Sequence, residues 1–251
     1  MIEQLKPIVQ RFFNKRGFEI IRMSTGLRPE EAATIDLAKP HTAASLGRNL
    51  GMLDAVRYVH ENGIPGAIVE CGVWRGGSMM IAAKLLKDLG DTSRDLYLYD
   101  TFEGMSAPTD ADVMFDGTKA EAVLDEADKK EGVENYWCYA GVEFVRRNMA
   151  LTGYPMERMH FVKGKVEDSI PKTLPERIAL LRLDTDWYES TVHELVHLYP
   201  LLAPGGPLII DDYGHWEGAK RAVDEYFAKL KPRPFLSRLD YTGRLAIKPS
   251  A

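Results

Sequence analysis

The chain has 251 residues, of which 45% are hydrophobic and 27% charged, and its formal net charge is −5. This length is sufficient for one α/β domain with a complete core. The acidic balance argues against nucleic acid or an anionic membrane as a partner. No apolar stretch has the length of a membrane span, and the N-terminus lacks the apolar core of a signal peptide. We therefore expect a cytoplasmic protein whose two cysteines, Cys71 and Cys138, are reduced.

The first segment, residues 1–62, has the amphipathic pattern of helices and ends at the stop signal Gly63. It carries more apolar side chains than a short appendage buries alone. We expect it to pack on another subunit, giving a homo-oligomer (a dimer or higher), or to cap the site. The apolar residues concerned are Phe12, Phe13, Ile20, Ile21 and Met23.

Residues 63–251 alternate between short apolar runs and helical patterns, which predicts a doubly wound, mostly parallel α/β sheet. A hairpin around Thr242-Gly243 is expected to add antiparallel strands at the end. Residues 103–140, rich in Gly, Pro and charged side chains, are expected to form a lid-like insertion. The predicted strands are 67–71, 95–100, 159–164, 178–184 and 207–211, with hairpin strands 234–239 and 244–247. The predicted helices are 78–89, 142–151, 167–174, 189–202 and 217–230.

Acidic clusters follow two of these strands. Asp184-Thr-Asp186 ends one apolar run, and Asp211-Asp212 ends the next. Ligands bind at the carboxyl ends of parallel strands in such sheets, so the clusters should meet in one region. Like charges that close repel unless a cation lies between them, and an all-oxygen ligand set suits Mg²⁺ or Ca²⁺. The pattern therefore predicts a metal-assisted site.

A glycine-rich loop follows the first strand in Glu70-Cys-Gly-Val-Trp-Arg-Gly-Gly-Ser78. Gly76 and Gly77 would let a ligand approach the backbone at a helix N-terminus. The spacing is neither a dinucleotide fingerprint nor a P-loop. Glu70 suits a cationic amine, and Asp100, at the end of the second strand, suits ribose hydroxyls. Together these features favour S-adenosylmethionine as the cofactor.

Four runs in the expected order resemble the macrocin O-methyltransferase (TylF-type) family: IPGAIVECGVWRGGSM, YLYDTFEGM, LLRLDTDWYESTVHELVHLYPLLAPGG and LIIDDYGHWEGAKRAVDEY. The resemblance implies a Rossmann-like class I methyltransferase domain that uses S-adenosylmethionine and Mg²⁺ to methylate a sugar hydroxyl of a glycosylated natural product. It further implies that Asp184, Asp211 and Asp212 bind the metal. The residues implied to hold the cofactor are Glu70, Gly72, Val73, Gly76, Gly77 and Ser78 for methionine, Asp100 and Thr101 for ribose, Val166 and Glu167 for adenine, and Asp184.

Methyl transfer to a hydroxyl also requires a base. Asp186 is two residues after Asp184 and would point to the same side if the strand continued, so we favour it. His215 is the rival, because imidazole is matched to neutral pH. The expected acceptor is a vicinal diol, which a cation can chelate. A catechol would satisfy the same argument and ranks second.

Two other classes of function compete with this interpretation. His193-Glu-Leu-Val-His197, with Glu217 beyond it, has the spacing of a zinc peptidase. Prolines and glycines end this helix, however, and its apolar positions fit a helix that covers the sheet. A non-catalytic cofactor-binding protein is the second alternative, and the intact glycine loop and acidic positions argue against it.

Overall fold

The structure is a computed structural model in which residues 9–13, 15 and 26–250 are described. Residues 9–13 are helical, and Phe12 and Phe13 are exposed there. The other predicted N-terminal contact residues (Ile20, Ile21 and Met23) lie outside the described residues. Among the described residues, no helix has both the length and the apolar character that crossing a membrane requires.

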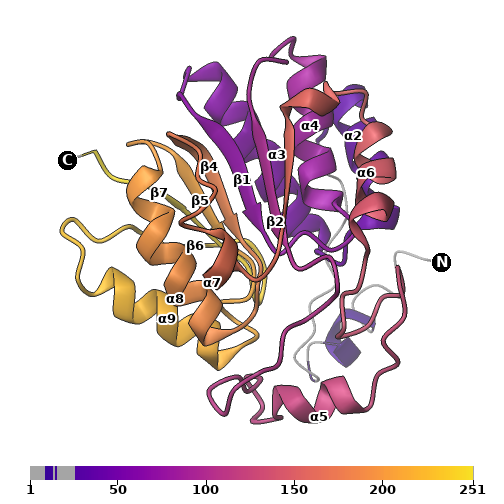
Figure 1. The fold of residues 1–251 in the computed structure, drawn as a ribbon, viewed down its shortest axis with the longest axis vertical. Coiled ribbons are helices and arrows are strands. Elements are labelled where there is room, and N and C mark those ends of the chain that lie inside the picture. Colours follow the sequence, from indigo (N-terminus) through magenta and orange to yellow (C-terminus); the bar gives the residue numbers. More distant parts are fainter. Residues whose placement is uncertain (1–8, 14, 16–25, 251) are drawn as a thin grey trace.

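Seven strands of the described residues form one mixed sheet (Figure 1), in the order β3-β2-β1-β4-β5-β7-β6. The first five strands are parallel, and β7 and β6 add to the edge as antiparallel strands. The predicted doubly wound sheet with a C-terminal antiparallel hairpin is thus confirmed. The strands are β1 (Ala67–Cys71), β2 (Leu96–Asp100), β3 (Met159–Lys163), β4 (Ile178–Leu183), β5 (Pro207–Ile210), β6 (Ser237–Arg238) and β7 (Arg244–Ile247).

Helices cover both faces of the sheet (Figure 1). One face carries α2, α3, α4 and α6, and the other carries α7, α8 and α9. Strands β1 and β4 are buried along their whole length because helices cover them on both sides. The helices are α2 (Pro29–Ala38), α3 (Leu46–Glu61), α4 (Gly77–Asp88), α5 (Ala120–Asp125), α6 (Val142–Ala150), α7 (Val166–Ser169), α8 (Tyr188–His197) and α9 (Glu217–Phe227), with short 3-10 turns η1 (Lys39–His41), η2 (Met156–Arg158) and η3 (Tyr199–Leu201).

Helices α2 and α3 share a core with α4 and the sheet, through residues such as Ile35, Met52 and Ile81. Helices α2 and α3 are therefore packed on the rest of the chain, whereas Phe12 and Phe13 of residues 9–13 are exposed. The insertion contains α5 and a small core of its own, in which Met114 and Leu124 pack with Trp187 and Trp216 from the loops after β4 and β5. The insertion is thereby attached beside the carboxyl ends of the strands.

Three predicted helices are shorter than expected: 217–230 ends at Phe227, and proline explains the other two. The predicted hairpin strand 234–239 is reduced to Ser237–Arg238. The helix predicted at 167–174 ends at Ser169, since Pro171 forces the preceding Ile170 into an extended conformation. The helix predicted at 189–202 ends at His197 and continues as η3, which contains Pro200.

Candidate active site

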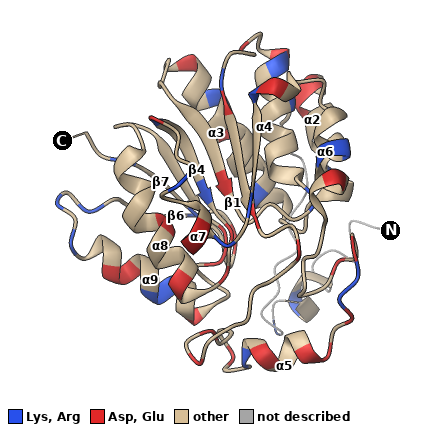
Figure 2. Cartoon of the chain, viewed as in Figure 1, with Lys and Arg blue, Asp and Glu red and all other residues tan. Residues whose placement is uncertain are grey.

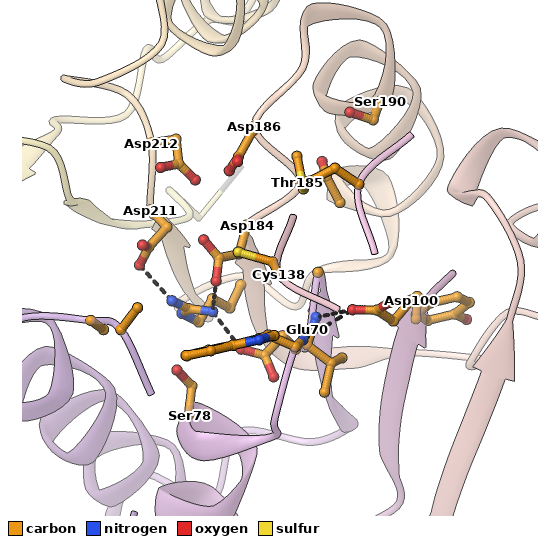
Figure 3. A pocket seen from close by; sticks show the side chains of 18 of the residues that line it. Glu70, Ser78, Asp100, Cys138, Asp184, Thr185, Asp186, Ser190, Asp211 and Asp212 are labelled. Carbon is orange, nitrogen blue, oxygen red and sulfur yellow. Dashed lines mark hydrogen bonds and ion pairs between the residues drawn. The ribbon is translucent and has the colours of Figure 1, made fainter. Parts of the chain in front are cut away.

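A cavity of about 270 Å³ opens at the carboxyl ends of β1, β2, β4 and β5. Its walls come from the loop after β1, the start of α4, the start of α7, the loops after β4 and β5, the insertion, and the β6–β7 turn. Acidic residues gather at this end of the sheet (Figure 2), and several carboxylates point toward one another there (Figure 3). Every site residue named from the sequence lines this cavity except Gly76.

The backbone of the loop between β1 and α4 lies close to the backbone of the loop after β4. Gly72 has a φ of +79°, and a Cβ there would overlap the carbonyl oxygen of Asp184. Gly76 has a φ of +93° and turns the chain into α4. Gly77 and Ser78, the first two residues of α4, line the cavity. The unpaired N–H groups of this first helical turn favour an anionic ligand group.

Glu70 at the end of β1 is 1% exposed and forms an ion pair with Arg182 through its Oε1 atom. Its second oxygen, Oε2, has no hydrogen-bond partner among the described residues. Burial raises the pKa of Glu70 to about 7, and Arg182 opposes that rise. A buried acceptor without a donor is costly, so this atom fits a ligand that brings a cationic N–H group.

Asp100 at the end of β2 has a role that the sequence did not predict. Its Oδ2 accepts hydrogen bonds from the N–H groups of Val73 (2.7 Å) and Trp74 (3.0 Å). Its Oδ1 accepts one from the N–H of Phe102 (2.6 Å); the hydroxyl of Thr101 lies 3.4 Å from Oδ1 but donates to the carbonyl oxygen of Gly104 (2.6 Å). These donors use most of the carboxylate's acceptor capacity. Asp100 therefore holds the glycine-rich loop to the turn after β2, and burial raises its pKa.

The wall beyond Asp100 belongs to the start of α7. Val166 is buried and Glu167 is exposed, and both line the cavity together with Thr101. An apolar surface next to a polar side chain suits a purine ring.

Asp184, Asp186 and Asp212 form a carboxylate cluster, which is the one candidate metal site found among the described residues. One oxygen from each lies within 4.8 Å of the others. Burial raises the pKa of all three, to about 7 for Asp186, and repulsion between the carboxylates adds to the rise. The Oδ2 atom of Asp212 is buried without a partner among the described residues. This oxygen set fits a hard divalent cation.

The approach of Asp186 to Asp184 has a different cause from the one expected. Strand β4 ends at Leu183, so strand alternation does not align the two residues. Asp186 instead has a φ of +71°, a left-handed conformation that bends the loop back. A non-glycine residue in that conformation stores strain, which is common at functional sites.

Asp211 is the member of the predicted ligand set that lies outside the cluster. Its Oδ1 atom lies 2.5 Å from Nη2 of Arg182, and its Oδ2 contacts Nη1 of Arg48. Arg182 Nη1 also lies 2.6 Å from Asp184 Oδ2 (Figure 3). Arg48 on α3 additionally contacts Asp240 in the β6–β7 turn. The guanidinium groups of Arg48 and Arg182 thus neutralise part of the negative charge of Asp184 and Asp211 in this structure.

Two aromatic residues of the loop after β5, His215 and Trp216, line the cavity. His215 lines the cavity, and its Nδ1 lies 3.2 Å from the hydroxyl of Tyr241. Burial and Arg48 lower the pKa of His215, which makes it neutral at pH 7. Trp216 is 2% exposed and packs edge-on against Trp187, so both tryptophans join the insertion's core while Trp216 also lines the cavity.

The His193–His197 pair on α8 does not form part of the candidate metal site in the described residues. Their rings lie against each other, with centroids 4.1 Å apart. Glu194 between them is fully buried and accepts a hydrogen bond from Thr185. This arrangement provides no zinc site on α8 and agrees with a helix that covers the sheet.

Several cavity residues were not found from the sequence. Arg182 had a signal, because a charged residue inside an apolar strand run needs a buried partner. Arg48, Tyr136 and Cys138 had none, since they reach the cavity from a distant helix and from the insertion. The remainder of this group is His41–Ala44, Trp74, Tyr99, Gly104, Met105, Ser106, Gly164, Lys165, Thr185, Ser190, Tyr241 and Thr242.

Comparison with known sequences gives one consistent family. The family model described as Macrocin-O-methyltransferase (TylF) matches residues 11–246. The Streptomyces olivaceus 8-demethyl-8-(2,3-dimethoxy-alpha-L-rhamnosyl)-tetracenomycin-C 4'-O-methyltransferase is 36% identical over 203 residues, covering 81% of this chain and 74% of that protein. The Micromonospora griseorubida mycinamicin III 3''-O-methyltransferase is 33% identical over 234 residues, covering 90% and 87%.

Solved structures give the same result. The O-methyltransferase NovP superposes with a TM-score of 0.71 at 32% identity, covering 84% of this chain and 83% of that one. The calicheamicin methyltransferase CalS11 superposes with a TM-score of 0.60 at 20% identity over 88% and 93% of the two chains, a likeness of fold.

Proposed function

This chain belongs to the macrocin O-methyltransferase (TylF) family, and we propose that it methylates one hydroxyl of a vicinal diol on the sugar of a glycosylated natural product. As a family member it is an S-adenosylmethionine-dependent O-methyltransferase. The relative named for a rhamnosyl tetracenomycin supports a sugar acceptor. The observation that carries the proposal is one cavity that is lined both by the glycine-rich loop with Glu70 and by the carboxylate cluster.

The cofactor half of the proposal rests on Glu70 and the glycine-rich loop. Glu70 Oε2 would accept a hydrogen bond from the ammonium group, which supplies the donor that this buried oxygen lacks. Gly72, Val73, Gly77 and Ser78 would bind the rest of the methionine, with Gly76 setting the turn. When bound, S-adenosylmethionine supplies an electrophilic methyl group. The ribose is assigned to Asp100 and Thr101, and the adenine to Val166 and Glu167.

We propose Asp184, Asp211 and Asp212 as ligands of Mg²⁺, with Asp186 kept as the base. Asp211 already binds a cation, the guanidinium of Arg48, and we propose that Mg²⁺ replaces this group. When bound, the metal supplies charge neutralisation and a template for two neighbouring hydroxyls. The family supports this ligand set, and the carboxylate cluster supports a divalent cation.

Asp186 is proposed to take the proton of the attacking hydroxyl at a carboxylate oxygen. A carboxylate oxygen of Asp186 lies within 4.8 Å of oxygens of Asp184 and Asp212, so Asp186 borders the place where a chelated hydroxyl would lie. His215 is neutral at pH 7, but its Nδ1 faces Tyr241. Asp184 and Arg182 position the loop, and the insertion, as a proposed lid, limits the access of water.

Turnover of a panel of glycosides and catechols tests this function. Each acceptor is incubated with S-adenosylmethionine and Mg²⁺, and S-adenosylhomocysteine is measured. We expect turnover of glycosides with a free vicinal diol, and its loss in excess chelator. Turnover of catechols alone would replace the sugar assignment, and full activity in chelator would remove the metal from the mechanism. A cofactor-binding relic would bind S-adenosylmethionine with no coupling to Mg²⁺.

The assignment of residues 1–62 to a cap or an oligomer contact stays a prediction, as does the homo-oligomer. Most of the apolar residues behind it lie outside the described residues.

A further inference from the structure

Three aromatic side chains from distant segments meet beside the cavity: His215 and Tyr241 line it, and Phe115 contacts both of their rings. Phe115 comes from the insertion, His215 from the loop after β5 and Tyr241 from the β6–β7 turn. Their ring centroids are 5.9 Å (Phe115–His215), 6.4 Å (Phe115–Tyr241) and 6.1 Å (His215–Tyr241) apart. Phe115 and Tyr241 are nonetheless 59% and 61% exposed. The three residues are called the aromatic rim below.

The aromatic rim is held by backbone hydrogen bonds. The N–H of Phe115 donates to the carbonyl oxygen of His215 (2.9 Å), and the N–H of Gly214 donates to that of Thr242 (3.0 Å). Gly214 also allows close approach, because a Cβ there would overlap the carbonyl oxygen of Tyr241. The three segments therefore form one preorganised surface.

This surface continues the wall of the active site. His215 and Tyr241 both line the cavity, and Thr242 Oγ1 donates a 2.7 Å hydrogen bond to the carbonyl oxygen of Asp211. A sugar whose hydroxyls reach the carboxylate cluster would leave its glycosidic substituent near the aromatic rim. Rings that are exposed to water in the free enzyme would bury apolar surface, and so stabilise the complex, if an apolar group of the substrate packed against them.

The charges around the aromatic rim argue against a nucleotide substituent. Arg48 and Arg182, the guanidiniums at this end of the cavity, are already bound by carboxylates. A diphosphate would therefore find both of these guanidiniums in use, whereas a flat aromatic ring would find three ring partners.

We propose that the aromatic rim binds a planar, aromatic aglycone of the acceptor and so selects the finished glycoside over the free sugar or a sugar nucleotide. This inference rests on the proposed function and adds the class of group attached to the sugar. Each ring is expected to contribute through face or edge contacts with the aglycone.

A matched set of acceptors tests the proposal: one sugar as its aryl glycoside, its methyl glycoside and its nucleoside diphosphate derivative. We expect kcat/KM to be highest for the aryl glycoside. Phe115→Ala and Tyr241→Ala should each lower the aryl-to-methyl preference about tenfold, which corresponds to the loss of one ring contact. Tyr241→Phe should keep the preference, since the ring remains.

Phe235→Ala is the control, because Phe235 is 83% exposed, does not line the cavity, and, among the described residues, has no ring contact with the aromatic rim of the kind that Phe115 makes. It should leave the preference unchanged. Three results would contradict binding of an aromatic aglycone at the rim without contradicting the proposed sugar methylation. They are equal turnover of the aryl and methyl glycosides by the wild type, an equal loss of activity on both acceptors in the rim variants, and a preference for the sugar nucleotide. If no glycoside is turned over, the proposed function fails instead. In that case, calorimetry measures the binding affinities of the aryl and methyl glycosides and so tests the aromatic rim independently of turnover. Equal affinities would contradict binding of an aromatic aglycone there.

Discussion

Thr185 Oγ1 donates a 2.9 Å hydrogen bond to Oε1 of Glu194, a side chain with no exposed surface. Thr185 lies between Asp184 and Asp186 in the loop whose left-handed turn at Asp186 assembles the carboxylate cluster. The hydrogen bond therefore fixes this loop to α8, behind the site, and Glu194 is a positioning residue.

The first prediction follows from this contact. Glu194→Gln keeps an acceptor for Thr185 and should keep the Mg²⁺ affinity and rate within about threefold. Glu194→Leu leaves the hydroxyl without its partner, a loss of about 1–3 kcal/mol, and should weaken Mg²⁺ binding about tenfold or more. Calorimetry with Mg²⁺ and steady-state kinetics measure both. Equal losses in the two variants would show that the hydrogen bond is not what positions the loop.

The second prediction concerns the pH dependence of stability. Burial raises the pKa of Glu194 to about 8, above its usual value of 4.5. Between these values the folded protein keeps the proton that the unfolded chain releases, so this group's contribution to stability is lost as pH rises toward 8. Glu194→Gln does not titrate. Its free energy of unfolding relative to wild type should therefore increase from pH 5 to pH 8, by at most about 1.4 kcal/mol per pH unit. Urea unfolding at several pH values measures the free energy of unfolding of both proteins. A difference between variant and wild type that does not change with pH would contradict the prediction.

The third prediction separates metal ligand from base. Asp211→Asn and Asp212→Asn should each weaken Mg²⁺ binding about tenfold or more, because each removes a ligand charge. Asp186→Asn should bind Mg²⁺ nearly as the wild type does but lose about 10²-fold or more in kcat. His215→Gln should retain most of its kcat. If Asp186→Asn loses the metal and Asp211→Asn does not, the ligands are Asp184, Asp186 and Asp212.

The fourth prediction uses Arg48 as a competitor for the metal. Arg48→Met removes the guanidinium from Asp211 and should tighten Mg²⁺ binding several-fold, since one cation no longer has to displace another. Arg57→Met is the matched control. It lies on the same helix, has the same 15% side-chain exposure, and pairs with Glu31 instead. A weaker metal affinity in Arg48→Met would mean that Arg48 supports the site rather than competes.

The fifth prediction concerns Asp100. Asp100→Ala removes the acceptor for the Val73 and Trp74 N–H groups and should weaken S-adenosylmethionine binding about tenfold or more, by releasing the glycine-rich loop. The midpoint of thermal unfolding should change little, because the core beneath is unaltered. An unchanged calorimetric affinity would exclude Asp100 from the cofactor site.

Most of the fold could be predicted because its determinants are local. Apolar runs such as 178–183 mark strands, and the carboxyl ends of parallel strands in neighbouring positions must meet, which brought Asp184 and Asp212 together. The short α7 could have been predicted as well, since Pro171 was visible in the sequence.

The electrostatic partners of the site could not be predicted in the same way. The Arg48–Asp211 ion pair joins residues 163 positions apart, and no sequence period encodes such a contact. The left-handed turn at Asp186 is also set by the surrounding packing, because an aspartate does not by itself require that conformation.

The long separations within this charge network have a consequence for folding. Besides Asp211, Arg48 binds Asp240, 192 residues away, and Ser45 binds the same carboxylate across 195 residues. Closure of such long loops is slow and follows local helix formation. At a synthesis rate of about 5–20 residues per second, Arg48 waits roughly 10–30 s for Asp211 to be made. We therefore expect the charge network of Arg48, Asp211 and Asp240 to close late in folding, after helix α3 has formed.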